Sequence, residues 1–85
     1  MIARSEIKSL ILRALLSADG TPIREDILTE TVQKGFTKAP PLVDIDIARR
    51  ELEREKFIAG NSDDLGGEST WTLTIKGQHR AKQLA

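Results

Sequence analysis

Two arginines placed four residues apart are the side chains of this chain best suited to bind an anion. Arg50 and Arg54 lie in a segment, residues 44–56, whose apolar residues recur with the spacing of an α-helix. That spacing turns Ile45, Ala48 and Leu52 inward and Ile47, Arg50, Glu51 and Arg54 outward. Because residues four apart share one side of a helix, the two guanidinium groups can contact phosphates or the edge of a guanine base.

Acidic residues in the same segment give a second interpretation. From Asp44 to Lys56 there are five acidic and four basic residues, a net charge of −1. Glu51, Glu53 and Glu55 are interleaved with the arginines and can pair with them, which is typical of a solvated helix face. The residue types alone leave anion binding and solvation equally open.

Other kinds of chemistry find no support in the residue types. The chain contains no cysteine and one histidine, His79, so a thiolate site, a zinc site and a catalytic triad are not expected. The aspartates lack the spacing of a calcium loop, and Gly66-Gly67 neither follows an apolar strand nor opens a helix. We therefore expect neither a cofactor nor an enzymatic activity.

Length and composition predict one small domain over residues 1–85. Hydrophobic residues make up 39%, enough for one core, and the charged residues balance to a formal net charge of zero. Zero net charge gives no overall attraction to DNA, so DNA binding would depend on a local basic patch. No apolar run approaches the length of a membrane span, and the absence of cysteine fits a reducing cytoplasm, which is the expected location.

The periodicity of apolar residues predicts four helices and a hairpin. The first expected helix is capped by Ser5 and ended by Gly20, and the second runs from Thr21-Pro22 to Gly35. The third begins at the prolines 40–41 or at Asp44 and ends near Lys56, and strands follow at 57–59 and 70–74. The last helix is capped by Thr74 and places Gly77, Ala81 and Leu84 on one side. The expected core joins their inner stripes: Ile7, Leu10, Ile11, Leu15, Ile27, Leu52, Trp71 and Leu73.

Two stretches carry a resemblance to a known family. One is Ala48 to Ile58, with an inward leucine before a polar turn and an apolar pair; the other is Trp71-Thr-Leu73-Thr74-Ile-Lys-Gly77, followed by Leu84. With the order of elements, they resemble the winged helix-turn-helix family, particularly regulators of the MarR and PadR type. The resemblance implies an α+β fold, a three-helix bundle with a two-stranded β-wing and a C-terminal helix.

The same resemblance implies binding of duplex DNA by a small transcription regulator through its third helix. Arg50 and Arg54 would be the central contacts, and Arg49, Lys38 and Lys34 would support them at the DNA backbone.

Two features of this sequence depart from the pattern of the family. The connection from Gly35 to Pro41 is longer than usual and holds two prolines, which affects the docking angle of the third helix. Lys56 stands where the family often has glycine before the first wing strand.

The segment expected to form the tip of the wing favours an alternative function. Residues 61–68 include Asp63, Asp64 and Glu68 and no basic residue, whereas DNA-binding wings usually carry arginine or lysine. This composition predicts a mobile loop or a surface for a basic protein partner. A protein-interaction module that does not bind DNA is therefore the second hypothesis for this chain.

Two further surfaces are predicted from the helices. Leu12 and Leu16 lie beside the core stripe of the first helix and are expected to form an exposed apolar patch, which favours a homodimer through that helix. The last helix is locally basic and is a candidate for contact with an anion or with another subunit. Its basic side chains are Lys76, His79, Arg80 and Lys82.

Overall fold

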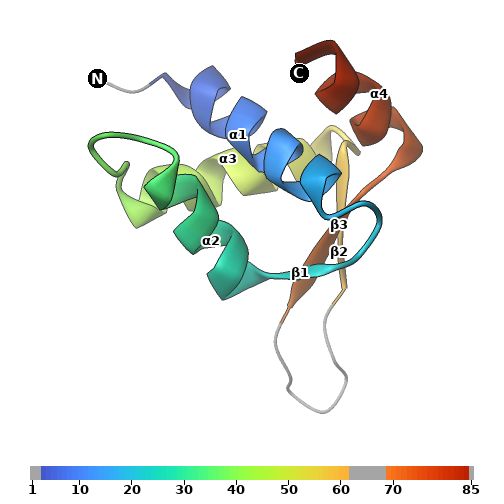
Figure 1. Cartoon of the computed structure of the whole chain (residues 1–85), viewed down its shortest axis with the longest axis horizontal. Coiled ribbons are helices and arrows are strands. Elements are labelled where there is room, and N and C mark those ends of the chain that lie inside the picture. Colours follow the sequence, from blue (N-terminus) through green and yellow to red (C-terminus); the bar gives the residue numbers. More distant parts are fainter. Residues whose placement is uncertain (1–2, 62–68, 85) are drawn as a thin grey trace.

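A computed structural model describes residues 3–61 and 69–84, in which four helices pack together with a small sheet at their edge (Figure 1). The elements in chain order are α1 (Arg4–Ser17), β1 (Ile23–Arg24), α2 (Glu25–Lys34), α3 (Leu42–Arg54), β2 (Ile58–Asn61), β3 (Thr70–Leu73) and α4 (Ile75–Leu84). The predicted α+β architecture, with three helices before a hairpin and one after it, is confirmed.

The sheet has three strands rather than the two that were predicted. Its order is β1-β3-β2 and both pairings are antiparallel, with Ile23 opposite Trp71 and Ile58 opposite Leu73. β1 lies where the second helix was expected to begin, so that helix starts only at Glu25. A strand of two residues is too short to show an alternating pattern, which is why periodicity misses it.

One core joins all four helices to the sheet, and α1 packs against α2, α3 and α4 (Figure 1). The buried apolar side chains are Ile7, Ile11, Leu12, Leu15, Leu28, Val32, Ile45, Ala48, Leu52, Ile58, Trp71 and Ala81. The predicted inner face of α3 is confirmed by this set, and so is the placement of Trp71 in the core.

Two expectations about burial are wrong. Ile27 is exposed, because the later start of α2 sets its inner face at Leu28 and Val32. Leu12 is buried between the helices, so Leu12 and Leu16 form no exposed patch, and the argument for a dimer through α1 fails. The other two core candidates outside the buried set, Leu10 and Leu73, are partly buried against it.

The helix ends agree with the sequence in part. α1 begins at Arg4 after Ala3, so Ser5 lies inside the helix and is not its cap. α3 follows directly on Pro41, which selects the prolines over Asp44 as its start. Thr74 caps α4 as predicted, since its Oγ1 accepts a hydrogen bond from the Gly77 backbone N–H at 3.0 Å.

The segments α3, β2 and α4 meet in a closely packed junction. Lys56 adopts a left-handed conformation with φ 66°, which suits the glycine that the winged helix-turn-helix family often has at this position. Thr74 Oγ1 also donates a hydrogen bond to the Lys56 carbonyl oxygen at 2.6 Å. A Cβ atom on Gly77 would lie 1.9 Å from the Phe57 carbonyl oxygen. α4 is therefore held directly against the segment that leads from α3 into the wing.

Candidate nucleic-acid interface

The outward face of α3 presents a single stripe of four side chains. Val43, Ile47, Arg50 and Arg54 follow one another at intervals of four, three and four residues, which places them on one side of the helix, opposite Ile45 and Leu52. The side chain of Arg50 is 69% exposed, and Arg54 is also exposed. The stripe is apolar toward the start of α3 and basic toward its end.

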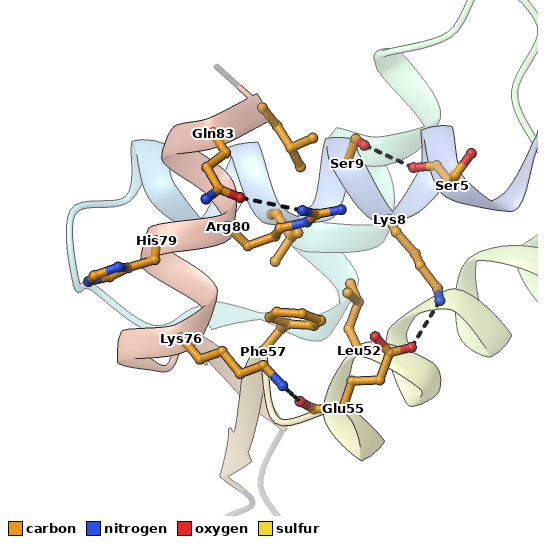
Figure 2. A pocket seen from close by; sticks show the side chains of 12 residues that line it. Ser5, Lys8, Ser9, Leu52, Glu55, Phe57, Lys76, His79, Arg80 and Gln83 are labelled. Atoms are coloured by element: carbon orange, nitrogen blue, oxygen red, sulfur yellow. Dashed lines mark hydrogen bonds and ion pairs between the residues drawn. The ribbon is translucent and has the colours of Figure 1, made fainter.

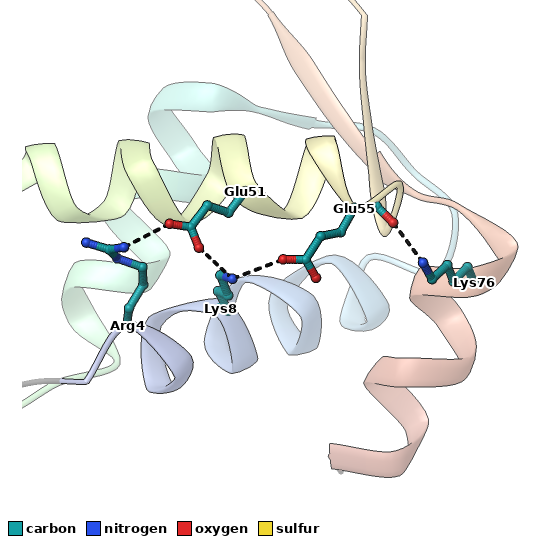
Figure 3. A network of polar contacts seen from close by, with 5 residues as sticks. All are labelled: Arg4, Lys8, Glu51, Glu55 and Lys76. Atoms are coloured by element: carbon teal, nitrogen blue, oxygen red, sulfur yellow. Dashed lines mark hydrogen bonds and ion pairs between the residues drawn. The ribbon is translucent and has the colours of Figure 1, made fainter.

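Acidic side chains on one flank of α3 are held by basic residues of α1 (Figure 3). Arg4 Nη1 lies 2.9 Å from Glu51 Oε1, and Lys8 Nζ lies 2.7 Å from Glu51 Oε2 and 3.3 Å from Glu55 Oε1. The expectation that Glu51 faces outward is wrong, since it faces α1. Glu51 and Glu55 therefore do not neutralise Arg50 and Arg54.

The proton equilibria at this flank follow from the same contacts. The hydrogen bond from Lys8 lowers the pKa of Glu51, and Arg4 adds to that effect. In the other direction, the hydrogen bond to Glu51 raises the pKa of Lys8. Both groups are thus charged over a wider pH range than in the unfolded chain, and the bridge between α1 and α3 persists across neutral pH.

Arg49 lies on the other flank, where it joins three elements. Its Nη1 is 3.3 Å from Glu25 Oε1 of α2, its Nη2 contacts Asp46, and its guanidinium carbon lies 5.2 Å from the centre of the Trp71 ring. Trp71 Nε1 in turn donates to Glu25 Oε1 at 3.4 Å. The Arg49 side chain is only 12% exposed. It has little surface to offer a phosphate, and its contacts fix α3 against the sheet.

The two arginines of the stripe differ in their partners. Arg50 Nη2 lies 3.1 Å from Asp46 Oδ2, the carboxylate that Arg49 also contacts. Arg54 makes no ion pair within residues 3–61 and 69–84. Arg54 is thus an exposed cation available to an external anion, and Arg50 shares its acidic neighbour with a second arginine.

The two predicted supporting lysines lie before α3. Lys34 Nζ at the end of α2 is 2.7 Å from Glu30 Oε1, and the pair is exposed. Lys38 lies in the connection of residues 35–41, is exposed and has no ion pair in the described part of the chain. This connection and Asp44 line a shallow, mostly apolar pocket. Both lysines are exposed, Lys34 in a pair with Glu30 and Lys38 without an ion pair in the described residues, and neither belongs to the α3 stripe.

The basic residues of α4 border a different pocket, of about 500 Å³, between α1, α3 and α4 (Figure 2). Lys76 Nζ lies 4.5 Å from the centre of the Phe57 ring and donates to the Glu55 carbonyl oxygen at 2.9 Å. Arg80 donates to Gln83 at 3.3 Å, and His79 points away from the other lining side chains. Two of these basic groups are thus already engaged inside the protein.

The described residues form neither a metal site nor a membrane span. No group of three or more histidine, cysteine, aspartate or glutamate side chains is arranged to hold a metal ion. None of the described helices is long and apolar enough to cross a membrane. The residues predicted to form the acidic tip, Asp63, Asp64 and Glu68, lie outside the described part of the chain, as does nearly all of the loop that was expected to be mobile.

Comparison with known proteins gives structural matches only. No family model and no curated protein matches the chain. The crystal structure of SSV1 F-93 is 25% identical, with a TM-score of 0.71 over 91% of this chain and 80% of that one. TA0346 from Thermoplasma acidophilum, proposed to be a transcriptional regulator, is 18% identical, with a TM-score of 0.74 over 94% and 77%. Pex from Anabaena, a protein associated with the circadian clock, is 20% identical, with a TM-score of 0.76 over 99% and 75%.

These matches extend over nearly the whole chain and include the helices and the small sheet described above. Their sequence identities are too low for the roles of individual residues to be carried over to this chain. The chain is a winged-helix domain, similar in structure to proteins that include a proposed transcriptional regulator.

Proposed function

We propose that the chain binds duplex DNA through the outward face of α3 and acts as a small transcription regulator in the cytoplasm. In the winged-helix arrangement the third helix is the element that enters the major groove. The stripe of Val43, Ile47, Arg50 and Arg54 is the surface that this helix would present. The similarity to TA0346 supports the regulatory part of the proposal.

The observation that carries the proposal is the separation of charges around α3. Glu51 is paired with Arg4 and Lys8 on the side of α1, so its carboxylate does not oppose an approaching phosphate at the stripe. Arg50 and Arg54 remain on the exposed face. A segment whose net charge is negative can thus offer a basic surface on one side.

Each residue then has a distinct role. Arg50 would hold a guanine edge with two of its guanidinium nitrogens, and Arg54 would contact a base or a phosphate. Lys38 and Lys34 would contact the DNA backbone and contribute to affinity for every sequence. Arg49 is assigned a positioning role, because its contacts with Glu25 and Trp71 orient α3 on the sheet.

A titration against mixed-sequence duplex DNA at several salt concentrations tests this proposal. Four basic side chains, those of Arg50, Arg54, Lys38 and Lys34, are available to contact phosphates. The logarithm of the binding constant should therefore fall with the logarithm of the salt concentration at a slope no steeper than about −4. Arg54→Ala should weaken binding and reduce that slope by about one. Arg13→Ala is the matched control, because Arg13 is exposed on the opposite side of α1 from Arg4 and should leave both values unchanged. Absence of duplex binding at low salt would refute the proposal.

A protein-interaction module is the second candidate function, and one observation favours it. Leu42 and Val43 are both 61% exposed at the start of α3, directly after the connection of residues 35–41. Apolar side chains exposed together are a common feature of protein-binding surfaces. This function predicts no duplex binding and capture of a protein partner that is lost in Leu42→Ala and Val43→Ala together.

A further inference from the structure

The apolar half of the α3 stripe has no role in the contacts that the proposed function assigns to the arginines. Val43 is 61% exposed although it is apolar, and Ile47 beside it is half-buried. Neither side chain can bind a phosphate or donate to a base edge. Their position in line with Arg50 and Arg54 nevertheless places them where a helix in the major groove meets bases.

We infer that Val43 reads the C5-methyl group of a thymine, at about three base pairs from the guanine contacted by Arg50; this inference rests on the proposed function. The major groove displays one apolar group on an unmodified base, the thymine methyl, and apolar side chains discriminate thymine from cytosine by contacting it. Val43 is the exposed apolar side chain that stands in line with the two arginines.

Helix geometry sets the separation between the two contacts. Val43 and Arg50 are seven residues apart, which at 1.5 Å per residue is about 10.5 Å along the helix axis. Successive base pairs rise by about 3.4 Å. A helix lying along the groove therefore places the two side chains at positions about three base pairs apart. The expected site contains a thymine and a guanine at that spacing.

Leu42 provides a test of whether contact with the thymine methyl group requires only an exposed apolar side chain or one that also lies in the stripe. It is exposed to the same extent as Val43, but it lies about 100° around the helix and therefore outside the stripe. Reading of a thymine methyl requires Val43 and not Leu42. Docking of a protein on an apolar surface would use both side chains, since both are exposed in the first turn of α3.

The experiment selects duplexes from a random library with the wild-type chain and then replaces each thymine of the selected site by deoxyuridine, which removes only the methyl group. One replacement should weaken wild-type binding about fourfold, the effect of losing one buried methyl contact. The same replacement should change the affinity of Val43→Ala less than twofold. Duplexes selected with the Arg50→Ala variant should show no preference for guanine at the position about three base pairs from that thymine.

The controls separate this inference from the proposed function on which it rests. Leu42→Ala should retain the full loss on deoxyuridine replacement, and circular dichroism should show that both alanine variants keep their helices. The inference is overturned if a duplex is selected but no thymine replacement weakens wild-type binding, or if Val43→Ala retains the whole loss. If no duplex is selected, the proposed function itself fails, and this inference fails with it.

Discussion

Arg49 and Arg50 are neighbours on α3, but one lies on the side of the helix that faces the sheet and the other on its outward face, and their surroundings differ accordingly. Arg49 faces the sheet, where Glu25, Asp46 and Trp71 surround it and leave 12% of its side chain exposed. Arg50 is rotated about 100° from it and is 69% exposed. One guanidinium group is enclosed by the fold and the next faces outward, so the position of a basic residue around a helix determines its surroundings.

The largest expected effect comes from breaking the inner side of α3. Leu52→Ala removes a fully buried side chain and should lower the free energy of unfolding by about 2–5 kcal/mol. Val43→Ala, on the exposed face, is the control and should change it by less than about 0.5 kcal/mol. Urea denaturation followed by circular dichroism measures both values. Equal losses in the two variants would mean that α3 is rotated relative to the arrangement described above.

A smaller loss of stability is expected on the sheet side. Arg49→Ala leaves Glu25 and Asp46 without a shared cation and removes the contact with the Trp71 ring, which should cost about 1–3 kcal/mol. Arg50→Ala should cost less than about 0.5 kcal/mol, because its single ion pair is exposed. Thermal unfolding of the two variants gives the comparison directly. A larger loss for Arg50→Ala would reverse the assignment of the two roles.

A gain in stability is expected just beyond the end of α3. Lys56 has a φ of 66°, which costs a residue with a side chain about 1 kcal/mol relative to glycine. Lys56→Gly should therefore raise the free energy of unfolding by about 0.5–1 kcal/mol, and Lys56→Ala, which keeps the strain, should not. Since Lys56 lies outside the stripe, the affinity of the Lys56→Gly variant for duplex DNA should differ from that of the wild type by less than twofold. A large loss of affinity would extend the interface beyond α3.

The smallest effect is expected on the flank that faces α1, and it should depend on pH. The lowered pKa of Glu51 stabilises the fold above its unfolded value of 4.5, and this contribution is lost as the pH falls through the lower folded value. The raised pKa of Lys8 stabilises the fold below 10.5 and is lost as the pH rises through the higher folded value. Thermal unfolding of Glu51→Gln against wild type should differ at pH 7 and converge below pH 4 and in high salt. A constant difference would show that the bridge acts through packing.

Local patterns predict the inner face of α3 and the cap at Thr74, because each depends on residues within one or two turns. The partners of Glu51 and the burial of Leu12 could not be predicted in this way. Both depend on how α1 packs against segments more than 40 residues away. The position of Arg49 also depends on β1, which delays the start of α2 and brings Glu25 under Trp71. Sequence patterns thus indicate which charged side chains lie outside the core, but not which of them are paired with another charged residue of the chain.

The close approach of Gly77 to the Phe57 carbonyl oxygen limits how sequences with this fold can diverge. Most surface positions accept many residue types, but a side chain at position 77 would have to move backbone atoms. A glycine three residues after a threonine at the end of β3 should therefore survive in homologues whose overall similarity has been lost. An ancestor or descendant without that glycine is expected to have rebuilt the attachment of its last helix.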